Sequence, residues 1–161
     1  KHFQELNKGI TSLVKSLQGT NTILIITSDH GSVVTPPSKR VVLSKHPTLK
    51  ETLTLPLSGD PRVAYCYVRP FKTKQFEHYV RKHLSHACSL HKSEDLIKKG
   101  YFGLFTPHPS LRERIGDYTL IMKKNYAIAD SLAGTKEYFD KGIHSGLSDE
   151  EMFVPLITIA C

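Results

Sequence analysis

The chain has 161 residues, of which 39% are hydrophobic and 23% are charged, and its formal net charge is +7 at pH 7. This length and composition fit one compact folded domain and exclude a low-complexity chain. No apolar run approaches the roughly 18 residues of a membrane span, so we expect none. Lys and Arg are spread along the chain without a dense run, which favours a generally basic surface over a dedicated nucleic-acid face.

The cysteine content indicates a reducing compartment. The chain has three cysteines, Cys66, Cys88 and Cys161. Three cysteines cannot all pair within one chain, and they are too few for a disulfide scaffold. Because free thiols persist where disulfides are kept reduced, we expect a cytoplasmic protein.

Residues 1–17 predict an amphipathic helix, because apolar residues recur at three- and four-residue spacing from Phe3 through Ile10 to Leu17. No capping residue precedes Lys1, so we expect the helix, and more polypeptide, to begin before this sequence. Residues 22–27 form a continuous apolar, β-branched run, which is typical of a central strand covered on both faces.

The middle of the chain is less regular. Residues 32–61 contain five prolines and no periodicity, so we expect an irregular, mobile excursion there. Residues 63–68 predict a strand, and residues 74–88 predict an amphipathic helix. The residues expected on its inward face are Phe76, Tyr79, Val80, Leu84 and Ala87.

The last third alternates short helices and strands. Ser93 and Ser110 each begin a short helix that a glycine ends. Residues 118–122, 126–129 and 154–160 predict strands, and Ser148 with Glu151 has the spacing of a helix capping box. The sequence therefore predicts the α/β class.

Two short segments carry residues that can bind metal ions. Asp29 and His30 follow the apolar strand, at the carboxyl end where ligands gather in α/β folds. His144 lies between Gly142 and Gly146, just before the capped helix. A carboxylate and two imidazoles suit a cation such as Zn²⁺. Taken alone, each segment is explained more simply as an ordinary polar turn.

Taken in order, these segments resemble a known family. Thr22–Gly31 is similar to the metal-binding strand and turn of the alkaline phosphatase superfamily, and Gly142–Ile157 to the C-terminal metal-histidine segment of type I phosphodiesterases and nucleotide pyrophosphatases. Gly100–Asn125 and the run Gly59-Asp60-Pro61-Arg62 resemble the stretch between those motifs.

The resemblance implies a three-layer α/β/α fold, with residues 1–161 as the C-terminal part of the domain and 32–61 as an irregular insertion. It also implies two divalent metal ions, zinc or alternatively manganese. Asp29 and His30 would hold one ion, and His144 would help to hold the other. The implied reaction is hydrolysis of a phosphodiester or nucleotide pyrophosphate.

The family also uses a Thr or Ser nucleophile and further metal ligands that match nothing in this sequence. We therefore expect no catalytic nucleophile in this chain, a missing N-terminal part that supplies it, and no activity of the chain alone. Ser145 stands where the family commonly has glycine. Rival functions are a phosphomonoesterase, phosphomutase or sulfatase of the same superfamily, and a non-catalytic α/β binding domain.

Other polar residues are weaker candidates. His83, His86, Cys88 and His91 lie within nine positions. On a helix His83 and His86 are neighbours but Cys88 points elsewhere, and no Cys-x-x-Cys pair exists, which argues against a structural zinc site. For His108, Arg112 and Arg114 we favour a solvent-exposed loop and helix face over contact with a substrate phosphate.

Overall fold

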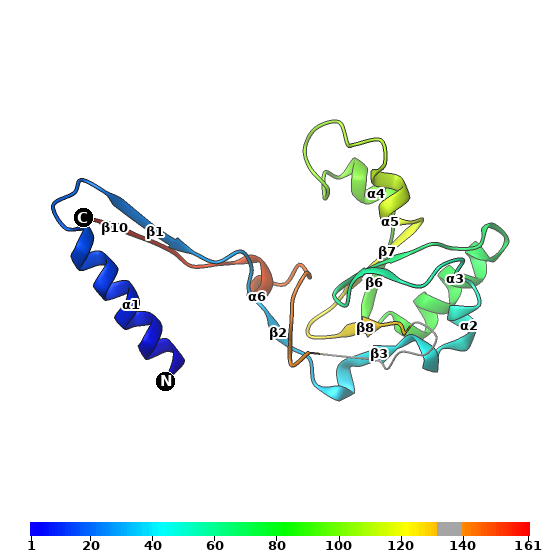
Figure 1. Ribbon diagram of the computed structural model, residues 1–161. Coiled ribbons are helices and arrows are strands. Elements are labelled where there is room, and N and C mark those ends of the chain that lie inside the picture. The colour runs from blue at the N-terminus through cyan, green and yellow to red at the C-terminus, as the bar shows by residue number, and fades with distance from the viewer. Residues whose placement is uncertain (132–139) are drawn as a thin grey trace. The chain divides into compact units, whose positions relative to one another are not determined.

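The structure is a computed structural model that describes residues 1–131 and 140–161. It divides into two compact units (Figure 1): Lys1–Gly31 with Phe153–Cys161, and Ser32–Met152. Helices and sheets are mixed along the chain, which confirms the α/β class. None of the helices in the described ranges is both long enough and apolar enough to cross a membrane.

The first unit contains one helix and a two-stranded sheet. Helix α1 (His2–Leu17) confirms the predicted helix. Strand β1 (Ile23–Thr27) runs antiparallel to β10 (Leu156–Ala160), with Ile25 opposite Thr158. The link between α1 and β1 includes Gly19 and Asn21, both with positive φ.

The prediction of a central strand covered on both faces is wrong for β1. Within the described residues, β1 pairs with β10 alone, and Ile25 keeps 60% of its surface exposed. A two-stranded ribbon has too few neighbours to bury both faces, whatever the apolar content of its strands. The run 22–27 is thus a strand, as predicted, but an exposed one.

The second unit is built on a four-stranded antiparallel sheet of order β4-β5-β7-β6. The sheet pairs Leu120 with Ala64 on one side and with Leu90 on the other. Its strands are β4 (Ser58–Asp60), β5 (Val63–Cys66), β6 (Cys88–Lys92) and β7 (Tyr118–Met122). Strand β6 was not predicted.

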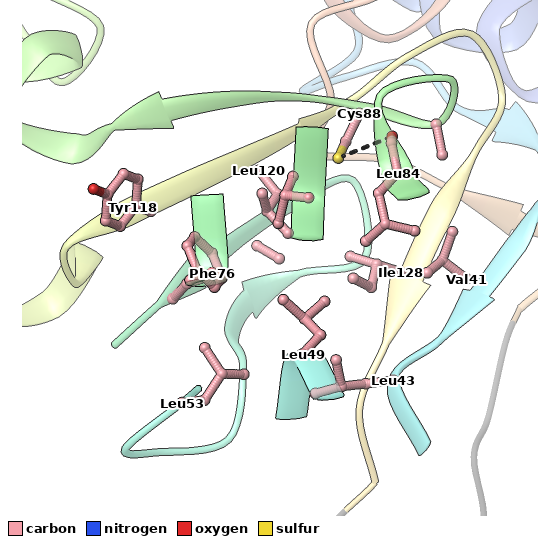
Figure 2. Packing of buried hydrophobic residues seen from close by; sticks show 14 of the residues in the cluster. Val41, Leu43, Leu49, Leu53, Phe76, Leu84, Cys88, Tyr118, Leu120 and Ile128 are labelled. Carbon is pink, nitrogen blue, oxygen red and sulfur yellow. Dashed lines mark hydrogen bonds between the residues drawn. The ribbon is translucent and has the colours of Figure 1, made fainter. Parts of the chain in front are cut away.

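A helix packs its predicted apolar face into the core (Figure 2). A 3₁₀ turn, η3 (Pro70–Lys72), leads into α3 (Thr73–Tyr79), which continues as the π-helical turn η4 (Val80–Leu84). Phe76, Leu84 and Leu120 are fully buried. The inward spacing predicted for 74–88 is confirmed, but the helix ends at Leu84 and the chain enters β6 at Cys88.

Residues 32–61 run irregularly through short elements, as expected, but they pack into the same core, so the expectation of a mobile excursion is wrong. Leu43 and Leu49 are fully buried (Figure 2), which is why this proline-rich segment is held in place without long elements. Its elements before β4 are β2 (Val33–Val34), η1 (Pro37–Lys39), β3 (Arg40–Val42), η2 (Leu43–Lys45) and α2 (Pro47–Lys50). That 32–61 is an insertion relative to the family that the sequence resembles stays a prediction.

Two small ladders and three short helices complete the unit. β3 pairs in parallel with β8 (Ala127–Ala129), and β2 pairs antiparallel with β9 (Gly142–Ile143). The short helices are α4 (Ser93–Lys98), α5 (Leu111–Ile115) and α6 (Asp149–Met152). After α5, Gly116 has φ +60°, and a Cβ there would lie 2.6 Å from the Cys66 carbonyl oxygen. Only glycine fits this turn.

Candidate metal centre

Asp29 and His30 lie in a tight polar turn directly after β1. The Asp29 side chain is 84% exposed and the His30 side chain 42% exposed. Asp29 Oδ1 accepts the backbone N–H of His30 at 2.9 Å. Ser28 Oγ donates to the His30 carbonyl at 2.9 Å and so fixes the turn. The hydrogen bond from the His30 backbone lowers the pKa of Asp29 below its usual value, so the carboxylate is ionised at neutral pH.

The His30 ring is oriented by its own backbone neighbour. Its Nδ1 lies 2.7 Å from the Gly31 carbonyl oxygen, and because a carbonyl can only accept, Nδ1 carries the proton. In the neutral ring, Nε2 then holds the lone pair that binds metals. Nε2 lies 3.5 Å from Asp29 Oδ2. Two ligands on a tetrahedral zinc are separated by about 3.4 Å, so this pair fits one edge of such a site.

His144 follows β9 in the second unit. Its ring Nδ1 lies 3.0 Å from Ser145 Oγ, and the residue is exposed. Ser145 has φ +81°, in the left-handed region that favours glycine. This conformation provides a physical reason why glycine is common at this position in the family that the sequence resembles.

The three predicted ligands are divided between the units, two in the first and one in the second. Their convergence on shared cations stays a prediction. In the ranges 1–131 and 140–161, no group of three or more His, Cys, Asp or Glu side chains is arranged to hold a metal ion. The described donors therefore fit a divalent cation in chemical type, but further ligands are needed to complete a site.

Sequence reasoning missed a buried ion pair beside His144. Arg62 binds Glu151 through two hydrogen bonds, Nε to Oε1 at 2.9 Å and Nη2 to Oε2 at 2.6 Å. Their side chains are 0% and 1% exposed. Burial alone would raise the pKa of Glu151. The hydrogen bonds from Arg62, Ser148 and Gly146, with the Arg62 charge, outweigh burial and lower the pKa to about 2.

Only part of this arrangement has a local signal in the sequence. The predicted capping box explains one contact, in which Glu151 Oε2 accepts the Ser148 backbone N–H at 3.4 Å. Ser148 Oγ also donates to Oε2 at 2.8 Å. The main partner, Arg62, lies 89 positions away in the chain, which no local pattern reveals.

The other polar candidates have structural partners. The His83 ring packs on Tyr79, and His86 contacts the Tyr126 ring edge-on. His91 hydrogen-bonds to Ser89, and burial raises the pKa of the Cys88 thiol to about 11. That these four residues bind no structural zinc stays a prediction.

Two of the polar residues around α5 also have local partners. His108 Nδ1 accepts the Ser110 backbone N–H at 3.2 Å, and Arg112 pairs with Glu94 at 3.0 Å. Arg112 also lines a cavity of about 680 Å³ beside α4 and α5. Arg112 and Arg114 are exposed, as predicted, and that they bind no phosphate stays a prediction.

Comparison with known proteins decides the family. The model of the type I phosphodiesterase / nucleotide pyrophosphatase family matches residues 1–147. The chain belongs to this family. The match includes Asp29, His30 and His144. The comparison with curated proteins finds no match.

Solved structures show the same fold as this phosphodiesterase-family chain. Human ectonucleotide pyrophosphatase / phosphodiesterase 5 superposes with a TM-score of 0.68 at 20% identity, over 96% of this chain and 39% of that one. An inactive form of the murine protein in complex with AMP superposes with a TM-score of 0.69 at 18% identity, with the same coverage of both chains. Phosphonoacetate hydrolase from Sinorhizobium meliloti 1021, bound to phosphonoformate, superposes with a TM-score of 0.57 at 20% sequence identity, over 88% of this chain and 37% of that one. This chain thus spans less than half the length of these structures.

Proposed function

We propose that this chain carries part of a two-cation site that hydrolyses phosphodiester or nucleotide pyrophosphate bonds. The observation that carries the proposal is the family match over residues 1–147, which includes all three candidate ligands. Asp29 and His30 would bind one divalent cation, and His144 would help to bind its neighbour. Zinc is the proposed metal, because a carboxylate and two imidazoles are ligands that zinc prefers.

The proposed reaction is an in-line displacement at phosphorus. A Thr or Ser hydroxyl outside these 161 residues would attack phosphorus and lose its proton, while the P–O bond to the leaving group breaks and its electron pair goes to the leaving oxygen. Water would then cleave the phospho-enzyme bond and restore the hydroxyl. Bound cations would lower the pKa of the attacking hydroxyl and stabilise the leaving oxygen. In support, the solved relatives are more than twice as long as this chain.

The experiment compares the 161-residue chain with a longer protein that contains it. Both are assayed with zinc or manganese on bis(p-nitrophenyl) phosphate, p-nitrophenyl phosphate and phosphonoacetate. We expect no turnover by the chain alone, diester hydrolysis by the longer protein, and a loss of that activity in its Asp29→Ala and His144→Ala variants. Preference for the monoester would favour a phosphomonoesterase, and nucleotide binding without turnover would favour a binding domain.

We also propose a cytoplasmic location. It is supported by Cys66, Cys88 and Cys161, all of which are free thiols in the structure. Cell fractionation tests it, and recovery of the protein outside the cell would refute it.

A further inference from the structure

The buried Arg62–Glu151 pair holds the loop that carries His144. One carboxylate accepts hydrogen bonds from two positions that follow His144: Gly146 N–H donates to Oε1 at 2.8 Å, and Ser148 Oγ donates to Oε2 at 2.8 Å. Arg62 donates to both carboxylate oxygens and also, through Nη1, to the Tyr126 carbonyl. Charge-assisted, two-point hydrogen bonding of this kind fixes the carboxylate in place.

Gly146 fits against this pair without a gap. A Cβ at Gly146 would lie 2.4 Å from Glu151 Oε2 and 2.9 Å from Arg62 Nε. The space beside the Gly146 Cα is filled by the ion pair and leaves no room for a side chain, so the backbone at position 146 is in direct contact with the ion pair. Glycine is needed here for the close approach and not for a special φ angle.

His144 is thereby held from both sides. On one side, Ile143 is buried and pairs with Val33 in the β2–β9 ladder. On the other side, Gly146 is bound to Glu151. Only His144 and Ser145 span the interval, and Ser145 has the unfavourable φ of +81°. Such a conformation persists when the surrounding structure fixes it.

Stability alone does not explain a buried ion pair at this position. Removing two charges from water costs so much that a well-packed apolar pair of similar volume is often as stable or more so. What the apolar pair cannot do is bind the Gly146 N–H and the Ser148 hydroxyl. The distinguishing contribution of Arg62 and Glu151 is thus the position of the loop.

We propose that Arg62 and Glu151 are positioning residues that set the conformation of the His144 loop for metal binding. The metal part of this inference rests on the proposed function. The two residues act through Gly146, whose backbone they hold two positions after the candidate ligand.

The test separates positioning from stability by replacing both charges. The double variant Arg62→Met/Glu151→Leu keeps an apolar filling of similar size. The matched control, Arg112→Met/Glu94→Leu, removes an exposed ion pair that involves neither Glu151 nor Gly146. Urea unfolding reports stability, amide hydrogen exchange at Ser145 and Gly146 reports the loop, and broadening of the His144 ring resonances by Mn²⁺ reports metal binding.

We expect the double variant to fold and to exchange the Gly146 amide hydrogen faster by about 10-fold or more. It should also need about 10-fold more Mn²⁺ to half-broaden the His144 ring resonances. That factor is the lower end of the range for outer-shell partners of metal ligands. The control variant should have the same Gly146 exchange rate and the same Mn²⁺ dependence as the parent. Parent-like exchange and parent-like Mn²⁺ dependence in a folded double variant would overturn the proposal. If the double variant does not fold, Glu151→Gln, which keeps the shape and one carbonyl acceptor, is judged by the same two readouts.

A His144→Ala reference separates the two proposals. If His144→Ala leaves the Mn²⁺ concentration that half-broadens the His30 ring resonances unchanged, the metal-site proposal fails. Hydrogen exchange at Gly146 then still decides whether the ion pair positions the loop, because that measurement involves no metal.

Discussion

Acid should remove most of the stabilisation that Glu151 provides. The folded-state pKa of Glu151 is about 2, against 4.5 for an unperturbed glutamate. Because the folded pKa is depressed, this stabilisation is fully present above pH 4.5 and is lost as the pH falls towards 2. A difference of one between the unfolded and folded pKa corresponds to about 1.4 kcal/mol, so the stabilisation amounts to about 3 kcal/mol at neutral pH. At pH 3 about 2 kcal/mol of this is lost.

The assay is the free energy of unfolding in urea, measured from pH 7 to pH 3 for the parent and for Glu151→Gln. The glutamine does not titrate, so the difference between the two proteins should be constant above about pH 5.5 and shrink by about 2 kcal/mol at pH 3. Glu150→Gln is the control, because Glu150 is the adjacent residue and is exposed. Stability curves of parent and Glu151→Gln that stay parallel down to pH 3 would refute the reasoning.

Three further predictions concern the packing of the chain and its thiols. Leu120→Ala should lower the free energy of unfolding by about 2–5 kcal/mol, because the side chain is fully buried on a strand paired on both sides, whereas Leu104→Ala at an exposed site should change it by less than about 0.5 kcal/mol. Gly116→Ala should lower the free energy of unfolding by more than about 1 kcal/mol, since its φ of +60° and the nearby Cys66 carbonyl exclude a Cβ. Gly9→Ala, in the open interior of α1, should instead raise it by about 0.5–1 kcal/mol. Equal changes in the free energy of unfolding for the two variants would count against the role given to Gly116. At pH 8 a thiol reagent should modify Cys161 rapidly and the buried Cys66 and Cys88 only on unfolding, because burial raises the pKa of both buried thiols; rapid reaction of all three in the folded chain would contradict this.

Local periodicity was enough to predict the elements that pack through one face. The three- and four-residue spacing of Phe76, Val80 and Leu84 predicted their burial. Strand β6 was missed because its five residues, Cys88–Lys92, mix polar and apolar types and follow a helix without a glycine or proline break. In 32–61 the prolines concealed the buried Leu43 and Leu49, because the elements of this segment are too short to show a periodic pattern in the sequence.

In the candidate site, too, residues that follow a local sequence rule could be predicted, and contacts between distant positions in the chain could not. Asp29 and His30 were predicted from a local rule, that ligands gather at the carboxyl end of a strand, and both lie there. The Arg62–Glu151 pair joins positions 89 residues apart, so only the folded chain reveals it. The exposure of β1 could not be predicted either, because an apolar run does not show how many strands will flank it.

The most direct test of the central claim is whether one paramagnetic ion reaches His30 and His144 together. Mn²⁺ is titrated into the chain while the imidazole resonances of both histidines are followed by NMR, with His108 as the reference histidine. We predict that both resonances broaden with the same midpoint, that His108 does not, and that Asp29→Ala raises the midpoint for both. Broadening of His30 to completion with His144 unaffected would contradict a shared metal site.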